Sequence, residues 1–107
     1  MQLPAMITEL VNAQNSFNSG AYANCFSVDA IVFDEGHNHE GREEIKAWIA
    51  AANLKYQSVM EPINYNESSD TAVLTAKVSG TFPGSPIDLK YNLEFNEGLI
   101  SSLKITG

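Results

Sequence analysis

The side chains best suited to acid–base chemistry lie close together, between positions 34 and 40. Asp34 and Glu35 are adjacent carboxylates at the end of a short apolar run, and His37 and His39 follow them. A carboxylate at the mouth of an apolar pocket has its charged form disfavoured by desolvation. Its pKa therefore rises, and it becomes a better proton acceptor near neutral pH. We expect Asp34 to act as a general base in such a pocket.

Each of these side chains also has a simpler interpretation. Asp34 and Glu35 could begin a solvated loop, and strand alternation would direct Glu35 away from the pocket that Asp34 faces. His37 could enter the pocket as an acid–base group or stay in solvent with His39. The histidines and the neighbouring carboxylates are suitable metal ligands. However, no third ligand follows the His37-x-His39 pair at a spacing characteristic of metal sites, so we expect no metal site.

The elements that flank this cluster would position it at a pocket. Residues 30–34 form an apolar run typical of a buried strand, which ends in Asp34. After a loop at 36–41, helical spacing predicts a helix over 42–52 with Trp48 on its buried stripe. A carboxylate would then lie beside a large aromatic ring, an arrangement that suits a small-molecule pocket.

The chain divides into helices in its first half and strands in its second. Apolar residues at helical spacing predict a first helix that begins at Pro4 and ends near Asn15. They also predict a short second helix over residues 21–27, which would carry Cys25 as a small buried residue. A single cysteine excludes an internal disulfide.

From residue 54 the hydrophobic period becomes 2, which predicts a meander of four antiparallel strands. Pro62 indicates an edge position or a bulge in the first of these strands. We expect a rigid turn at 82–86 and a three-residue hairpin at 96–98. The four expected strands cover residues 56–65, 71–81, 87–95 and 99–105.

Composition narrows the class of protein. With 107 residues, the chain has the size of one domain, 1–107, and can bury a core without disulfides. Its formal net charge of −7 disfavours binding to nucleic acid or to an anionic membrane surface. No apolar run long enough to span a membrane and no secretory signal is visible, so we expect a cytoplasmic protein.

Three helices and a meander with one strongly apolar face fit an α+β fold. In this fold a strongly bent antiparallel sheet would wrap around the three N-terminal helices. The cavity between the concave face and the helices would bind a small apolar ligand. Its expected walls are side chains that could equally belong to the core, namely Tyr22, Phe26, Phe33, Trp48, Tyr56 and Met60.

Four segments carry a resemblance to a known family: Asn18–Gly20 before the short second helix, Asp29–Asp34, Gly41–Ile45 and Phe95–Ile100. With the order of the elements, they make the whole chain resemble the SnoaL-like polyketide cyclases and ketosteroid isomerases of the nuclear transport factor 2 (NTF2-like) superfamily. The resemblance implies a cystatin-like cone and no required cofactor. It also implies a homodimer formed through the outer face of the sheet.

The resemblance assigns roles to three positions. In the ketosteroid isomerase pattern the first strand ends in an Asp that serves as the general base, and Asp34 matches it. The oxyanion hole of that pattern is a Tyr on the first helix and a protonated Asp on the penultimate strand. Leu10 falls at the Tyr position and Tyr91 at the Asp position. Tyr91 is therefore the remaining donor for a hydrogen bond to an enolate oxygen.

Three functions remain open. The first is a cofactor-independent isomerase, cyclase or dehydratase of an apolar carbonyl compound, with Asp34 as the base and Tyr91 or His37 as the donor. The second is a non-catalytic module that binds a small apolar molecule or another protein in the same cone, with Trp48 as a main contact. In the third, the cavity is vestigial, and the outer sheet face around Val73 serves only a homodimer.

Overall fold

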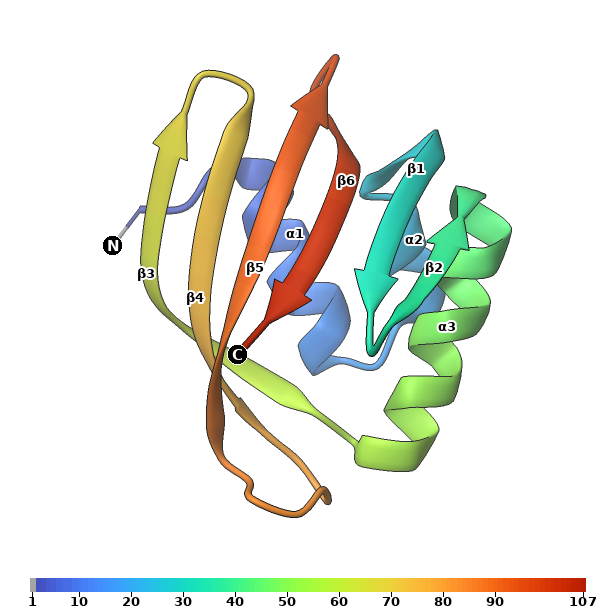
Figure 1. Ribbon diagram of the computed structural model, residues 1–107, viewed down its shortest axis with the longest axis vertical. Helices are drawn as coiled ribbons and strands as arrows, with labels where there is room; N and C mark the ends of the chain where they lie inside the picture. Colours follow the sequence, from blue (N-terminus) through green and yellow to red (C-terminus); the bar gives the residue numbers. More distant parts are fainter. Residues whose placement is uncertain (1) are drawn as a thin grey trace.

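The structure described here is a computed structural model, which describes residues 2–107. Its elements are α1 (Ala5–Asn15), α2 (Ser19–Ala23), β1 (Phe26–Asp34), β2 (His37–Glu40), α3 (Gly41–Tyr56), β3 (Val59–Ser68), β4 (Thr71–Ser79), β5 (Ile87–Asn96) and β6 (Leu99–Thr106). The strands form one curled sheet in the order β2-β1-β6-β5-β4-β3, with the helices on its concave side (Figure 1). This arrangement confirms the predicted α+β cone.

The third helix begins and ends with recognisable local signals. Gly41 opens α3 with a φ of +81°, and the Glu44 carboxylate accepts a hydrogen bond from the Glu40 backbone N–H at 2.9 Å. Gln57 ends the helix in the left-handed conformation. Ile45 and Ile49, one turn apart, are buried, so the helix turns its apolar stripe toward the sheet.

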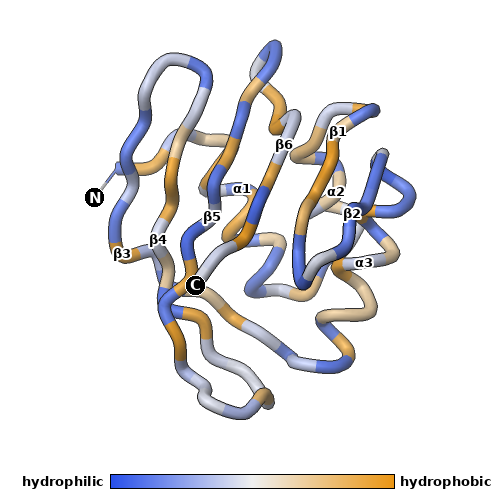
Figure 2. The backbone as a smooth tube through the Cα atoms, in the orientation of Figure 1, coloured by the Kyte–Doolittle hydropathy of each residue, from blue (hydrophilic) through white to orange (hydrophobic). Residues whose placement is uncertain are grey.

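Alternation along the strands separates the core from the outer surface. On β4, every second residue is buried, as predicted: Ala72, Leu74, Ala76 and Val78. Figure 2 shows the corresponding change between apolar and polar residues along the strands. The core between sheet and helices includes Ile7 and Leu10 from α1 and Leu103 from β6, none of which is exposed.

One strand pair departs from the expected antiparallel pattern. β1 runs parallel to β6, and this pairing joins the first strand to the end of the meander. The first strand, β1, and the last strand, β6, therefore lie side by side in one sheet, although they are far apart in the sequence.

None of the helices in residues 2–107 is both long and apolar enough to cross a membrane.

Several predicted boundaries are wrong. Residues 37–40, expected in a loop, form β2 and pair with β1. α2 ends at Ala23, so Cys25 lies buried in the connection to β1 and not on a helix. The hairpin between β5 and β6 has two residues, Glu97 and Gly98, both with positive φ.

The outer edge of the sheet is held by a side chain from the first helix. β3 is an edge strand, and its register shifts next to Pro62, which confirms the predicted edge or bulge. Asn15 donates from Nδ2 to the Met60 carbonyl at 3.0 Å, and its Oδ1 accepts from the Met60 N–H at 2.7 Å. This amide pairs with β3 as a neighbouring strand would.

Candidate functional site

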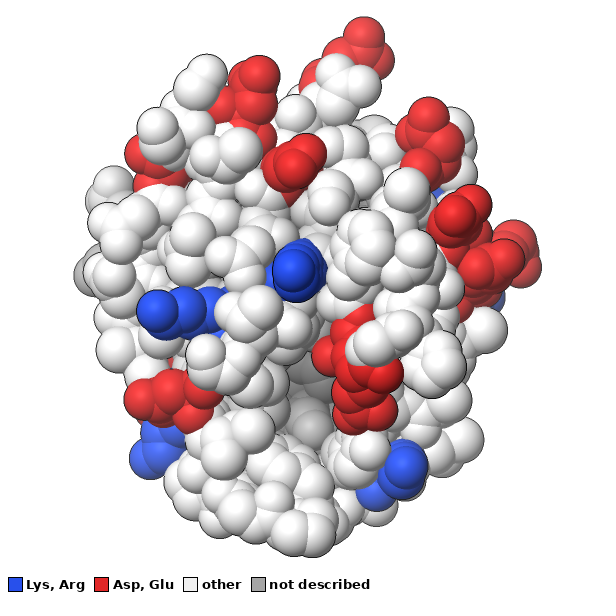
Figure 3. Space-filling view, viewed as in Figure 1, with Lys and Arg blue, Asp and Glu red and all other residues white. Residues whose placement is uncertain are grey.

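A cavity of about 490 Å³ lies between the concave face of the sheet and α3. Its walls come from α3, the β1–β2 turn, the inner faces of β5 and β6, and the loop between β4 and β5. Figure 3 shows a hollow on this side of the molecule with acidic atoms at its rim. Such a volume suits a small organic molecule.

Asp34 is the carboxylate of the cavity wall. It ends β1 on the same side of the strand as the buried Val32, because residues two apart point to the same face. Burial raises the pKa of Asp34, and the charge of Glu35 adds to the rise. Hydrogen bonding from the Trp48 side chain and the nearby His39 oppose this pKa shift. Asp34 therefore has the environment expected of a proton acceptor.

Glu35 also lines the cavity, although strand alternation predicted the opposite. The prediction is wrong because β1 ends at Asp34 and Glu35 already belongs to the turn. Its backbone is left-handed, with a φ of 51°, and Gly36 follows with a φ of 77°. Two positive φ angles in a two-residue turn re-aim the side chain independently of the pleat.

Two buried tyrosines contribute phenol groups to the cavity wall. Tyr91, on β5, is 6% exposed, and Tyr22, on α2, is 2% exposed. Burial raises the pKa of Tyr91, with a further contribution from the Asp34 charge. Burial likewise raises the pKa of Tyr22 well above its usual value, with Tyr91, Cys25 and Asp34 adding to it. Both phenols therefore stay protonated and are available as hydrogen-bond donors in the cavity.

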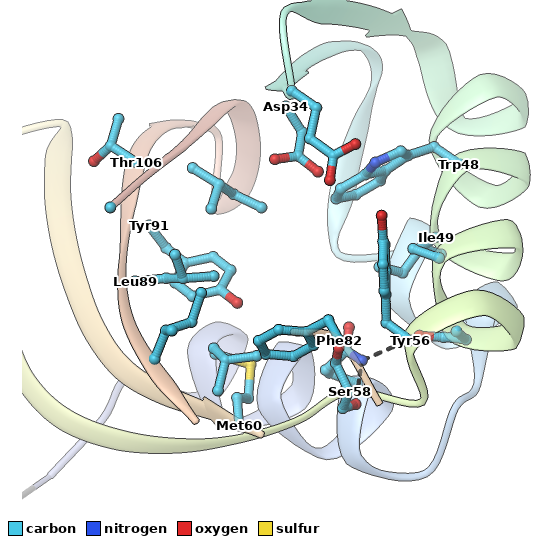
Figure 4. Close-up of a pocket in the computed structure, with 18 of the residues that line it drawn as sticks. Asp34, Trp48, Ile49, Tyr56, Ser58, Met60, Phe82, Leu89, Tyr91 and Thr106 are labelled. Carbon is cyan, nitrogen blue, oxygen red and sulfur yellow. Dashed lines mark hydrogen bonds between the residues drawn. The ribbon is translucent and has the colours of Figure 1, made fainter. Parts of the chain in front are cut away.

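Trp48 forms the wall beside Asp34, as Figure 4 shows. Its outer side is covered by His39, whose ring stacks on the indole with centroids 5.5 Å apart and an interplanar angle of 28°. His37, predicted as a catalytic group, is exposed and lies outside the cavity lining. Residues two apart on a strand share a face, so alternation does not separate the two histidines. Only His39, further along β2, stacks on Trp48, whereas His37 begins the strand beside the turn and stays exposed.

The other predicted wall residues divide into two groups. Tyr56 and Met60 line the cavity. Phe26 and Phe33 do not: Phe26 is completely buried in the core, and Phe33 is 38% exposed on the outer face. Phe33 precedes Asp34 on one strand, so the two side chains cannot share a face.

Sequence reasoning missed the contribution of the β4–β5 loop. Phe82, predicted to belong to a simple turn, packs at the base of the cavity with its ring edge-on to Tyr56, centroids 6.1 Å apart (Figure 4). The loop is tied to the end of α3, because the Thr81 N–H donates to the Tyr56 carbonyl at 2.7 Å. Gly80 permits this approach, since a Cβ there would lie 2.5 Å from the same carbonyl oxygen.

Two buried amides, Gln14 and Asn53, were also missed, and they line the cavity as well. Neither residue differs in its local sequence from an ordinary helical amide, so no local signal marks them.

Among residues 2–107, no group of three or more His, Cys, Asp or Glu side chains is placed to hold a metal ion. The cavity combines the perturbed carboxylate of Asp34 and the buried, protonated phenols of Tyr22 and Tyr91 with mainly apolar walls, which suits proton transfer.

Comparisons with known proteins agree with this fold. A candidate polyketide cyclase from Sinorhizobium meliloti shares 36% sequence identity, with a TM-score of 0.93 over 97% of this chain and 95% of that chain. A ketosteroid isomerase-like protein from Catenulispora acidiphila, in complex with trimethylamine, has 20% identity and a TM-score of 0.89, covering 99% and 87% of the two chains. An NTF2-like protein of unknown function from Cytophaga hutchinsonii has 17% identity and a TM-score of 0.80, covering 99% and 91%.

No protein-family model and no curated protein sequence matches the chain. The structural relatives nevertheless define its fold class, an α+β cone. The chain belongs to the NTF2-like superfamily, among its polyketide cyclase-like and ketosteroid isomerase-like proteins. The resemblance read from the sequence is confirmed.

Proposed function

We propose that this protein binds a small apolar carbonyl compound and moves a proton on the carbon beside the carbonyl group, as in an isomerisation, cyclisation or dehydration. The observation that carries the proposal is Asp34, whose carboxylate lies in an apolar and aromatic cavity that raises its pKa. Such a group is matched to accept a proton from carbon near neutral pH.

The proposed step uses three side chains. Asp34 accepts the α-proton, the C–H electron pair forms the enolate, and negative charge develops on the carbonyl oxygen. The Tyr91 phenol donates a hydrogen bond to that oxygen, and the Tyr22 phenol, close to both groups, is a second donor. The protonated Asp34 then returns the proton to the same carbon or to another carbon of the conjugated system.

Tyr22 would replace a donor that the family pattern places elsewhere. Leu10, at the position of the pattern's helix-one Tyr, is fully buried in the core and does not line the cavity. A phenol from α2 lies near the same carboxylate instead. The proposal therefore keeps two oxyanion donors, although only one was expected from the sequence.

Proton exchange at carbon tests the proposal directly. β-Tetralone, a bicyclic ketone with acidic α-protons, is incubated with the protein in D₂O, and loss of its α-proton signal is followed by NMR. We expect the wild type to accelerate exchange, and Asp34→Asn to lower the enzymatic rate by at least about 100-fold. Asp88→Asn, which makes the same chemical change at an exposed carboxylate outside the cavity lining, is the matched control and should keep the rate. An Asp34→Asn protein that exchanges at the wild-type rate would refute the assignment of the base.

A second candidate, a non-catalytic binding module, is favoured by the charge of the cavity. Its described lining contains five aromatic side chains and two carboxylates but no Lys, Arg or His. Aromatic faces and carboxylates attract organic cations, and the relative from Catenulispora acidiphila holds trimethylamine. Calorimetry with trimethylammonium chloride distinguishes the two: tight binding of this cation without any proton exchange on β-tetralone would favour the binding module.

A further inference from the structure

Two amide side chains form a polar floor in an otherwise apolar part of the cavity. Gln14 comes from α1 and Asn53 from α3, and they are only 7% and 9% exposed. Gln14 Nε2 donates to Asn53 Oδ1 at 3.1 Å and to the Ser58 carbonyl at 2.7 Å. These are the dashed lines near Ser58 in Figure 4, across the cavity from Asp34.

The Ser58 carbonyl fixes how both amides are oriented. A backbone carbonyl only accepts hydrogen bonds, so Gln14 must present its NH₂ group to Ser58. The same nitrogen uses its other hydrogen for Asn53, which must then turn its oxygen toward Gln14. One acceptor, Gln14 Oε1, and one donor, Asn53 Nδ2, remain without a hydrogen-bond partner among residues 2–107.

These two free atoms remain accessible from the cavity. In the described residues, no side-chain nitrogen or oxygen is both fully buried and unpartnered. Gln14 Oε1 and Asn53 Nδ2 therefore keep some accessible surface, and both residues line the cavity. A buried polar group without a partner is costly, so such a pair is stable only if water or a ligand completes it.

We propose that the ligand carries a hydroxyl group at the end opposite its carbonyl, and that the Gln14–Asn53 floor binds it. The hydroxyl donates to Gln14 Oε1 and accepts from Asn53 Nδ2, so both free atoms are satisfied by one group. The apolar side chains of Met60 and Phe82 also line the cavity and can pack against the rest of the ligand. The inference rests on the proposed function, because it names the substrate class of the same cavity.

Matched ligands test the floor separately from the reactive end. Calorimetry compares β-tetralone with its 6-hydroxy and 6-methoxy derivatives, whose substituents lie far from the carbonyl. We expect the wild type to bind the 6-hydroxy compound about tenfold more tightly than β-tetralone. The methoxy compound, which accepts but cannot donate, should fall between them. In Asn53→Leu the tenfold preference should fall to about threefold, because the donor is gone and only the Gln14 Oε1 acceptor remains.

Two further variants make the result specific. Asn53→Asp keeps an oxygen for Gln14 but replaces the donor with an acceptor. The 6-methoxy compound, which can only accept, should therefore lose its advantage over β-tetralone in this variant, and this decides the question if Asn53→Leu does not fold. Asn92→Leu makes the same chemical change on the outer face, where Asn92 donates to the Lys104 carbonyl, and should keep the tenfold preference.

The outcomes separate the two proposals. If the wild type binds β-tetralone and its 6-hydroxy derivative with equal affinity while proton exchange is intact, the Gln14–Asn53 pair does not bind a ligand hydroxyl. The proposed function then still stands. An undiminished advantage of the 6-methoxy compound over β-tetralone in Asn53→Asp also overturns this inference. Absence of both binding and exchange for all three ketones overturns the proposed function and this inference together.

Discussion

The concave and outer faces of the sheet use the same strands for different chemistry. On β5, Tyr91 is 6% exposed and lines the cavity, whereas the next residue, Asn92, lies on the outer face and bonds to β6. On β1, Asp34 lines the cavity, and Phe33 is 38% exposed on the other side. A displacement of one residue thus separates a perturbed acid–base group from an ordinary surface residue.

Removal of the Tyr91 hydroxyl should give the largest effect on the concave side. We expect Tyr91→Phe to slow proton exchange on β-tetralone by about 100-fold, because one donor to the developing oxyanion is lost. Tyr65→Phe is the matched control, since the Tyr65 hydroxyl bonds to Glu67 at an exposed position. A rate within about twofold of wild type for Tyr91→Phe would show that this phenol does not meet the oxyanion.

The second-largest effect should be a loss of stability when the β4–β5 loop is crowded at Gly80. In Gly80→Ala the new Cβ would lie 2.5 Å from the Tyr56 carbonyl oxygen and 2.9 Å from the Phe82 ring, so the loop must shift. We expect the free energy of unfolding to fall by about 1–3 kcal/mol, measured by urea denaturation. Gly20→Ala, where the nearest atom lies 3.7 Å away, is the control and should be nearly neutral. Equal stability of the two variants would contradict the tight approach.

The pH dependence of stability should distinguish Asp34 from surface carboxylates. Its pKa is raised on folding, so the native state binds the proton more tightly than the unfolded chain. Stability should therefore fall as the pH rises from the usual value of 3.8 through the raised pKa, and stay low above it. Asp34→Asn has no such loss of stability. Its melting temperature should exceed that of the wild type by up to a few degrees at pH 7 and should equal it near pH 3.8. Thermal melts over this range, with the exposed Asp88→Asn as control, measure the difference; an Asp34→Asn gain that persists at the acidic end would contradict it.

The outer face should respond least in the cavity assay. We propose that it forms the homodimer expected from the family resemblance, and Val73 lies on it, between the buried Ala72 and Leu74. Val73→Lys should lower the fraction of dimer in sedimentation velocity while changing proton exchange by no more than about twofold. A wild-type protein that sediments as a monomer at all concentrations would refute the dimer.

Periodicity explains what could be predicted from the sequence. β4 and β5 alternate clearly, so their boundaries and inner faces were predicted well. The same rule, applied to β1, would have excluded Phe33 once Asp34 was placed in the cavity. The missed strand β2 had a sequence signal too, namely the Glu-Gly dipeptide at 35–36. The same dipeptide at 97–98 was recognised as a hairpin, and both pairs form two-residue turns with positive φ angles.

Other parts of the site depend on tertiary contacts and leave no local trace. Phe82 reaches the cavity because the Thr81 N–H bonds to the Tyr56 carbonyl, 25 residues earlier. The Gln14–Asn53 pair joins residues 39 apart. Neither contact follows from helix or strand propensity, since it arises only when α1, α3 and the loop have packed together.

The Asn15 side chain has a consequence for how the protein behaves in a crowded solution. β3 is an edge strand, and an open edge is a template on which other chains can add strands and aggregate. Asn15 occupies the outward N–H and carbonyl of Met60, and two residues further Pro62 has no N–H to offer on the same side. The first half of this edge is therefore closed to intermolecular β-pairing by one amide and one imino acid.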